Sequence, residues 1–226
     1  MKKIESIMLI QPPVTRPMEF SAKNVRVSPF FPLGLAYLAA YLEKSGKYDI
    51  HILDGLAEGD IDEGALVEGG KKIRYGLSDE NIAEKIKQCN PDAIGVSCLF
   101  ASLEKDMATV CRIAKEVNPE IVTIAGGHHV GSMPVGILEQ YPPVDFAVKG
   151  EGEETLIDIL DAVNEENQNF NSLDGVTFRE EGVIITIPKT KYIMDIDSIP
   201  YPARHLFDMQ RYFDIAKSHR FSSEDT

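Results

Sequence analysis

Three consecutive stretches between Asp92 and Glu154 constrain the fold of this chain more than any other feature. They read DAIGVSCLF, EIVTIAGGHHV and DFAVKGEGEE, and each is a short apolar run that ends in small or polar residues just before a helix start. Nearly continuous apolar runs of this length are typical of strands buried on both faces of a parallel sheet. Ligands bind where the carboxyl ends of such strands meet. The three loops together predict a binding site, although a tight turn alone explains any single one of them.

The same alternation of strand and helix extends over residues 1–165. Strands are expected at residues 4–10, 48–53, 93–98, 121–125 and 145–148, and helices at 32–45, 78–88, 102–117, 135–140 and 152–163. This pattern predicts an α/β fold, a doubly wound five-stranded parallel sheet of the flavodoxin-like type with strand order 2-1-3-4-5. Residues 14–31 and the Gly- and acid-rich residues 56–77 show no clear period, so we interpret them as a long loop and a mobile excursion.

The character of the sequence changes after residue 165. Two apolar runs, 173–178 and 182–187, flank Glu180-Glu181-Gly182 and predict a β-hairpin. The segment IDSIPYPARHLFDMQRYF then leads into an aromatic helix. We therefore divide the chain into a domain at 1–165 and a hairpin with a connector and linker helix at 166–226.

Composition excludes several classes of partner. A formal net charge of −13 argues against nucleic-acid binding, because the sequence contains no dense cluster of basic residues that would bind phosphates. The three cysteines, Cys89, Cys98 and Cys111, form no CxxC or CxxxCxxC, so there is no zinc or iron–sulfur signature. Few, unpaired cysteines suit a reducing cytoplasm. No apolar run approaches the length of a membrane span. The sequence predicts a cytoplasmic protein that binds neither nucleic acid nor membrane.

The common nucleotide-binding and hydrolase motifs are missing from these loops. QPPVTRP follows the first strand, where a dinucleotide fingerprint would need glycines, and neither a P-loop nor GxSxG occurs. We assign no catalytic residue and no protein-derived metal site. Glu151, Glu153 and Glu154 are either paired acids or, as we favour, partners of a helix dipole. Of the adjacent His128 and His129 on a loop, one is expected to line a pocket and the other to be solvated, with an axial ligand or a hydrogen-bond donor as the alternative.

An ordered set of short motifs runs along the chain. It comprises Gln11-Pro12-Pro13, Pro32-Leu33-Gly34-Leu35, Asp54-Gly55, Ser97-Cys98-Leu99, Gly126-Gly127-His128-His129, Gly150-Glu151-Gly152-Glu153 and Ile199-Pro200-Tyr201-Pro202-Ala203-Arg204. Over roughly residues 1–200 this set resembles the cobalamin-binding domain at the amino end of cobalamin-dependent radical S-adenosylmethionine (SAM) enzymes. The resemblance implies a cobalamin-binding module that serves methyl transfer or cyclisation in the full-length protein.

The resemblance also implies roles for individual residues. Ser97 and Leu99 match a Ser-x-Leu pattern that lines the slot for the nucleotide tail of the cofactor, and Gly126 and Gly127 leave room for that tail. The full set of implied cofactor contacts is Gln11, Pro12, Pro13, Ser97, Cys98, Leu99, Ser102, Gly126, Gly127, His128, His129, Gly150, Glu151, Gly152 and Glu153.

Two departures from related patterns qualify the expected chemistry. The run Asp49-x-His51-x-x-Asp54-Gly55 is one residue off the Asp-x-His-x-x-Gly motif of classical base-off proteins and lies along the second strand, so we do not accept His51 as a cobalt ligand. The resemblance implies base-off cobalamin without that histidine. Without CxxxCxxC, the [4Fe–4S] cluster and SAM are expected only in a further radical SAM domain in cis. The alternatives are a cofactor-free flavodoxin-like interaction or positioning domain, and a small-molecule or nucleotide-binding domain that uses the same sheet edge.

Overall fold

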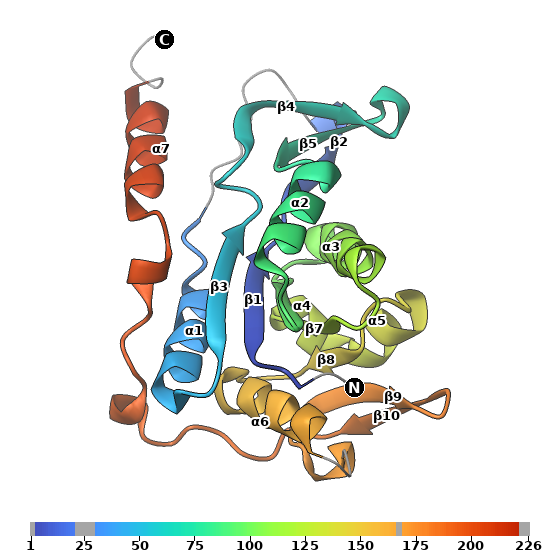
Figure 1. The fold of residues 1–226 in the computed structure, drawn as a ribbon. Coiled ribbons are helices and arrows are strands. Elements are labelled where there is room, and N and C mark those ends of the chain that lie inside the picture. Colours follow the sequence, from blue (N-terminus) through green and yellow to red (C-terminus); the bar gives the residue numbers. More distant parts are fainter. Residues whose placement is uncertain (1–2, 21–29, 166–168, 222–226) are drawn as a thin grey trace.

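A seven-stranded sheet runs through the molecule and carries helices on both faces (Figure 1). The computed structural model describes residues 3–20, 30–165 and 169–221. The strands of this sheet are β1 (Ser6–Gln11), β3 (Asp49–Asp54), β6 (Ala93–Ser97), β7 (Val122–Gly126), β8 (Phe146–Val148), β9 (Val176–Glu180) and β10 (Val183–Ile187). Their order is β10-β9-β8-β7-β6-β1-β3, and β3-β1-β6-β7-β8 are parallel. The predicted order 2-1-3-4-5 is confirmed.

The helices divide between the two faces of the sheet. They are α1 (Leu33–Ser45), α2 (Asp79–Cys89), α3 (Glu104–Val117), α4 (His128–Ser132), α5 (Pro134–Gln140), α6 (Glu153–Asn164) and α7 (Met209–Phe221). Along β1, Ile7 and Leu9 pack with α1 and α6, whereas Met8 and Ile10 pack with α2, α3 and α5. This alternation is what a strand buried on both faces requires. None of the helices in the described part of the chain is long and apolar enough to cross a membrane.

Local sequence signals set several of the boundaries. Ser78 accepts a hydrogen bond from Asn81 N at 3.2 Å and caps α2, and Gly46 ends α1 in the left-handed conformation with φ of +64°. Short 3-10 segments occur at η1 (Met18–Phe20), η2 (Glu68–Gly70), η3 (Ala101–Leu103), η4 (Phe170–Ser172), η5 (Ile196–Ser198) and η6 (Arg204–Leu206).

A second, three-stranded sheet was not predicted. It joins β2 (Val14–Pro17), β5 (Lys72–Gly76) and β4 (Asp60–Val67) in that order, all antiparallel, and stands beyond the carboxyl ends of β1 and β3 in Figure 1. The interpretations of 14–31 as a loop and of 56–77 as a mobile excursion were therefore wrong over these strands. Ile61 and Tyr75 form a small core here with Leu56 and Ile215. Residues 21–29 of the expected loop lie outside the described residues.

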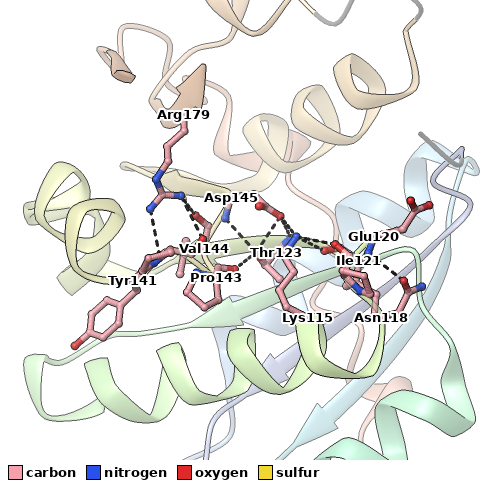
Figure 2. A network of polar contacts seen from close by, with 12 residues as sticks. Lys115, Asn118, Glu120, Ile121, Thr123, Tyr141, Pro143, Val144, Asp145 and Arg179 are labelled. Carbon is pink, nitrogen blue, oxygen red and sulfur yellow. Dashed lines mark hydrogen bonds and ion pairs between the residues drawn. The ribbon is translucent and has the colours of Figure 1, made fainter. Parts of the chain in front are cut away.

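The predicted hairpin is present and extends the main sheet. β9 pairs antiparallel with β8, and β10 pairs with β9. Arg179 of β9 donates to the carbonyl oxygen of Val144 at 2.7 Å and to that of Tyr141 at 3.3 Å, on the segment that leads into β8 (Figure 2). On the same segment Asp145 accepts from Lys115 Nζ at 2.6 Å and from Thr123 N at 2.9 Å. Asp145 thus fixes the segment before β8 to α3 and β7, and Arg179 fixes the hairpin to that segment.

Candidate functional site

A cavity of about 930 Å³ opens at the carboxyl edge of the parallel strands, where the sequence predicts a binding site. This volume lies at the upper end of the range for small-molecule sites. Its lining comes from β1, β2, β6, β7, β8, the start of α1, the start of α6 and the segment after β10. The residues are Leu9, Gln11, Val14, Thr15, Arg16, Phe30, Phe31, Pro32, Leu33, Gly34, Leu35, Leu38, Leu56, Gly95, Val96, Ser97, Leu99, Phe100, Ser102, Leu103, Ile124, Gly126, Gly127, His128, Gly131, Ser132, Val148, Lys149, Gly150, Glu151, Gly152, Glu153, Leu156, Lys189 and Tyr192.

The deep part of the cavity lies between the sheet and helices α1 and α6. Leu9, Ile124 and Val148 line it from the strands and also belong to the core that packs on these helices. Gly126 lines it at the end of β7, and a Cβ built there would find only Val148 Cβ, at 4.0 Å. The missing side chain at Gly126 therefore leaves open space in the slot, and a larger residue would fill that space.

Gly127 has a different, structural role. Its φ is +104°, and a Cβ there would lie 2.7 Å from the carbonyl oxygen of Cys98. That oxygen accepts from His129 N at 3.2 Å, and Cys98 N donates to the carbonyl oxygen of Gly126 at 2.7 Å. Close approach of two backbones at a position with positive φ requires glycine. Gly127 thus locks the loop after β6 against the loop after β7.

The two adjacent histidines lie on the short helix α4 rather than on a loop, and their surroundings differ. His128 lines the cavity. His129 turns away from it, with Nε2 2.5 Å from Glu104 Oε2, and Tyr141 donates its hydroxyl to Glu104 Oε1 at 2.8 Å. Burial opposes ionisation of Glu104, but the hydrogen bonds from His129 and Tyr141 lower its pKa. His129 is only 11% exposed and satisfied, so it is not the solvated histidine that we expected.

Charged groups gather where β8 leads into α6. Glu151 Oε2 accepts from the backbone N–H of Ile193 at 2.8 Å. Lys189 donates to Thr155 Oγ1 at 2.9 Å and pairs with Asp174 at 3.3 Å. Glu153, the first residue of α6, has a buried Oε2 that accepts no hydrogen bond from any residue that the structure describes. Glu151 and Lys189 are therefore engaged by the protein, whereas Glu153 is not.

The opposite wall is built from β2 and the start of α1. Thr15 donates from its backbone N–H at 2.9 Å and from its hydroxyl at 2.6 Å to the buried Asp106 of α3, which holds β2 over the cavity. Phe31 contacts Phe207 and Tyr212 edge to face, with ring centroids 4.9 Å and 5.5 Å apart. The wall therefore depends on the connector and α7 as well as on the sheet.

The structure brings most of the sequence-predicted site residues together. Gln11, Ser97, Leu99, Ser102, Gly126, Gly127, His128, Gly150, Glu151, Gly152 and Glu153 line the cavity. Four expected contacts lie outside its lining: Pro12, Pro13 and Cys98 are buried behind it, and His129 is paired with Glu104. We missed Gly95, whose position inside an apolar strand is a recognised signal of close approach. We also missed Arg16, Phe31, Lys189 and Tyr192, for which no local motif exists.

The geometry gives no protein-derived metal centre within residues 3–20, 30–165 and 169–221, where no group of three or more His, Cys, Asp or Glu side chains is placed to hold an ion. His51 lies along β3, with Nε2 3.1 Å from Asp49 Oδ2, and does not line the cavity.

The arrangement described so far defines an α/β domain with a mostly apolar cavity at the carboxyl edge of its sheet, the place where such folds bind ligands. A family model for the B12 binding domain matches residues 23–160, more than half of the sequence. The chain belongs to the B12-binding domain family. The resemblance to the cobalamin-binding domains of radical SAM enzymes is confirmed by the relatives described next.

The chain is 32% identical to cytidylyl-2-hydroxyethylphosphonate methyltransferase of Streptomyces wedmorensis, over 82% of the chain and 38% of that protein. It is 29% identical to the anaerobic magnesium-protoporphyrin IX monomethyl ester cyclase of Rubrivivax gelatinosus, over 84% of the chain and 31% of the cyclase. The fold matches that of TsrM from Kitasatospora setae, a radical SAM methyltransferase solved with cobalamin and a [4Fe–4S] cluster. The TM-score is 0.61 and the sequence identity 16%, and the match covers 91% of this chain and 34% of TsrM. The chain thus spans about a third of the length of these proteins.

Proposed function

We propose that this chain binds cobalamin in its base-off form, as the cofactor module of a radical SAM enzyme that transfers a methyl group or forms a ring. The observation that carries the proposal is the slot beside Gly126, where the absence of a side chain leaves room between the sheet and two helices. A mostly apolar slot suits the nucleotide tail of the cofactor, because its base needs a dry site with few polar partners.

The residues that line the cavity divide the work of holding this cofactor. Gly126 leaves space for the tail, and Ser97 and Leu99 flank it at the end of β6. The loop from Lys149 to Glu153 presents backbone and carboxylate groups at the start of α6. When bound, cobalamin supplies a cobalt centre that carries and transfers alkyl groups. The protein binds and orients that centre and excludes water from one side of it.

The base-off form follows from the proposal that the nucleotide tail occupies the slot beside Gly126. If the tail occupies the slot, its base cannot lie under the cobalt. His51 lies on β3 outside the lining, so it does not replace the base. We therefore propose that the lower face of the cobalt is either open or held by a residue other than His51.

We further propose that two parts of the chain have different functions. Residues 1–165 supply most of the lining that holds the cofactor, and Lys189 and Tyr192 complete it. Residues 166–226 also connect this module to a radical SAM domain in cis that carries the [4Fe–4S] cluster and binds SAM. The support is the partial coverage of the methyltransferase and the cyclase above, together with the likeness in fold to TsrM, a radical SAM methyltransferase solved with a [4Fe–4S] cluster. The substrate of the complete enzyme belongs to that further domain.

The test of the proposed function is retention of hydroxocobalamin by the purified chain after desalting, read from its visible spectrum. We expect retained corrin bands with a base-off spectrum in the wild type and a loss of binding of at least tenfold in Gly126→Leu. Gly136→Leu is the matched control, because Gly136 lies outside the lining and a Cβ there meets only Met133 Cε, at 3.4 Å.

A folded wild-type protein that stays colourless would contradict cobalamin binding and favour the cofactor-free scaffold. Tight binding of an adenine nucleotide by that colourless protein would favour the nucleotide-binding alternative instead. Equal retention by Gly126→Leu and the wild type would place the cofactor outside this slot.

A further inference from the structure

Glu153 combines two properties that rarely occur together in a side chain without a function. It lines the cavity, and its Oε2 atom is shielded from solvent yet accepts no hydrogen bond from the described residues. The only other buried side-chain atom in this state among those residues is Nη2 of Arg74, whose other nitrogens bond Leu77 and Asp79 and which does not line the cavity. Buried polar atoms without a partner are uncommon, and each one calls for an explanation.

The neighbouring acids show that the unpaired oxygen is specific to Glu153. Glu151 is two residues earlier on the same loop and accepts a hydrogen bond from Ile193 N. Glu154 is the next residue along α6 and is exposed, so water satisfies its carboxylate. Both Glu153 and Glu154 stand in the first turn of α6, where a negative charge is favourable. The helix start therefore explains why an acid is tolerated at Glu153, but it does not explain why the half-buried side chain keeps one shielded, unpaired oxygen in the wall of a cavity.

We propose that Glu153 is the hydrogen-bond acceptor for a neutral N–H or O–H donor of the bound corrinoid. Glu153 lines the cavity, and the terminal torsion of a Glu side chain is broad, so its carboxylate can present the unpaired oxygen to a ligand there. Cobalamin carries such donors as primary amides around its corrin ring and as a ribose hydroxyl on its nucleotide tail. This inference rests on the proposed function and adds a specific contact to it.

According to this proposal, Glu153 strengthens the binding of the corrinoid and lowers the stability of the apo protein. An unsatisfied buried acceptor destabilises the fold that contains it, and a ligand that donates to it removes the penalty. A residue with a purely structural role would behave in the opposite way, because its removal would destabilise the empty protein and leave affinity unchanged.

The experiment compares Glu153→Met with Glu154→Met. Each variant removes one negative charge from the first turn of α6 and introduces a side chain of similar length, but only Glu153 lines the cavity. We expect the apo form of Glu153→Met to melt at or above the temperature of Glu154→Met. We expect its dissociation constant for hydroxocobalamin, from spectroscopic titration, to be at least tenfold higher. Glu153→Gln keeps a carbonyl oxygen and should recover part of this affinity.

Titration with cobinamide, which has the ring amides but lacks the nucleotide tail, separates the two sources of the donor. A Glu153→Met effect that persists with cobinamide assigns the donor to the ring, and an effect that disappears assigns it to the tail. Equal affinity of the two Met variants for cobalamin, or a lower melting temperature of apo Glu153→Met, would overturn the inference while leaving the proposed function intact. A wild-type protein that binds no cobalamin would overturn both.

Discussion

Asp174 shows how a single carboxylate organises one wall of the cavity. It accepts hydrogen bonds from Thr190 N at 2.8 Å, from Thr190 Oγ1 at 2.6 Å and from Lys191 N at 3.2 Å, and it pairs with Lys189. Burial favours the neutral acid, but these hydrogen bonds outweigh it and hold the pKa of Asp174 well below its usual range. Since Lys189 and Tyr192 both line the cavity, the shape of this wall depends on an ionised Asp174.

Replacement of Asp174 by Asn should therefore destabilise the protein in a pH-dependent way. Because the pKa is lower in the folded state, the ionised form stabilises the fold fully above the unfolded value, about pH 4, and this contribution is lost as the pH falls toward the folded value. We expect Asp174→Asn to lower the free energy of unfolding by about 2 kcal/mol at neutral pH and by much less near pH 2. Urea unfolding at both pH values measures this, with the exposed Asp62→Asn as control. A deficit that does not change with pH would contradict the assignment.

At the scale of elements, the position of α7 against the rest of the fold is difficult to predict from sequence, yet it is fixed by specific contacts. Its Tyr212 donates a short hydrogen bond to Oδ2 of the buried Asp54, at the carboxyl end of β3. The other oxygen of Asp54 accepts from Leu56 N at 3.0 Å and from Ala57 N at 2.9 Å. Arg211 donates to the carbonyl oxygen of Ala57 at 2.9 Å. Since Tyr212 also contacts Phe31, the position of α7 is linked to the wall of the cavity.

Tyr212→Phe should remove the hydrogen bond between α7 and Asp54 while keeping the aromatic ring. The substitution leaves one oxygen of a buried carboxylate without its donor, and we expect a loss of about 1–3 kcal/mol in the free energy of unfolding. We also expect a weaker affinity for cobalamin, because without this hydrogen bond the ring at position 212 is held less firmly against Phe31 in the cavity wall. Thermal and urea unfolding, together with corrinoid titration, measure the two effects. Tyr201→Phe is the control, since Tyr201 is 94% exposed. Unchanged stability would mean that the hydroxyl of Tyr212 does not hold α7.

The strands that could be predicted from the sequence and those that could not differ in how much of their surface is buried. β1, β6 and β7 are buried on both faces, so their apolar runs are visible in the sequence alone. β4 is different, because only Ile61 is buried along DIDEGALV and its strand conformation depends on β5 and on the distant β2. In the same way, Ser97 and Gly126 end two strands that the sequence reveals, whereas Arg16, Phe31 and Lys189 reach the cavity through tertiary contacts that no local pattern records.

At the scale of the whole molecule, the hairpin makes the chain after residue 165 part of the main sheet. Phe178 of β9 is fully buried and packs near Phe146 of β8, with ring centroids 6.3 Å apart. The site depends on this continuity, because Lys189 and Tyr192 follow directly after β10. The functional division that we propose, a cofactor module at 1–165 and a connector at 166–226, is thus compatible with a single cooperative folding unit.

Arg179→Met tests that cooperativity. The substitution removes the donors that join β9 to carbonyl oxygens of the segment before β8, such as Val144 O at 2.7 Å, and it leaves those buried acceptors unpaired. We expect a loss of about 2–3 kcal/mol in the free energy of unfolding. Far-UV circular dichroism and tyrosine fluorescence should report one coincident urea transition whose slope equals that of the wild type. Arg112→Met, at an arginine side chain that is 46% exposed, should change stability by less than about 0.5 kcal/mol. A separate transition at low urea would instead show that the hairpin and connector unfold independently, because the contacts of β9 would then contribute nothing to the stability of β1, β6 and β7.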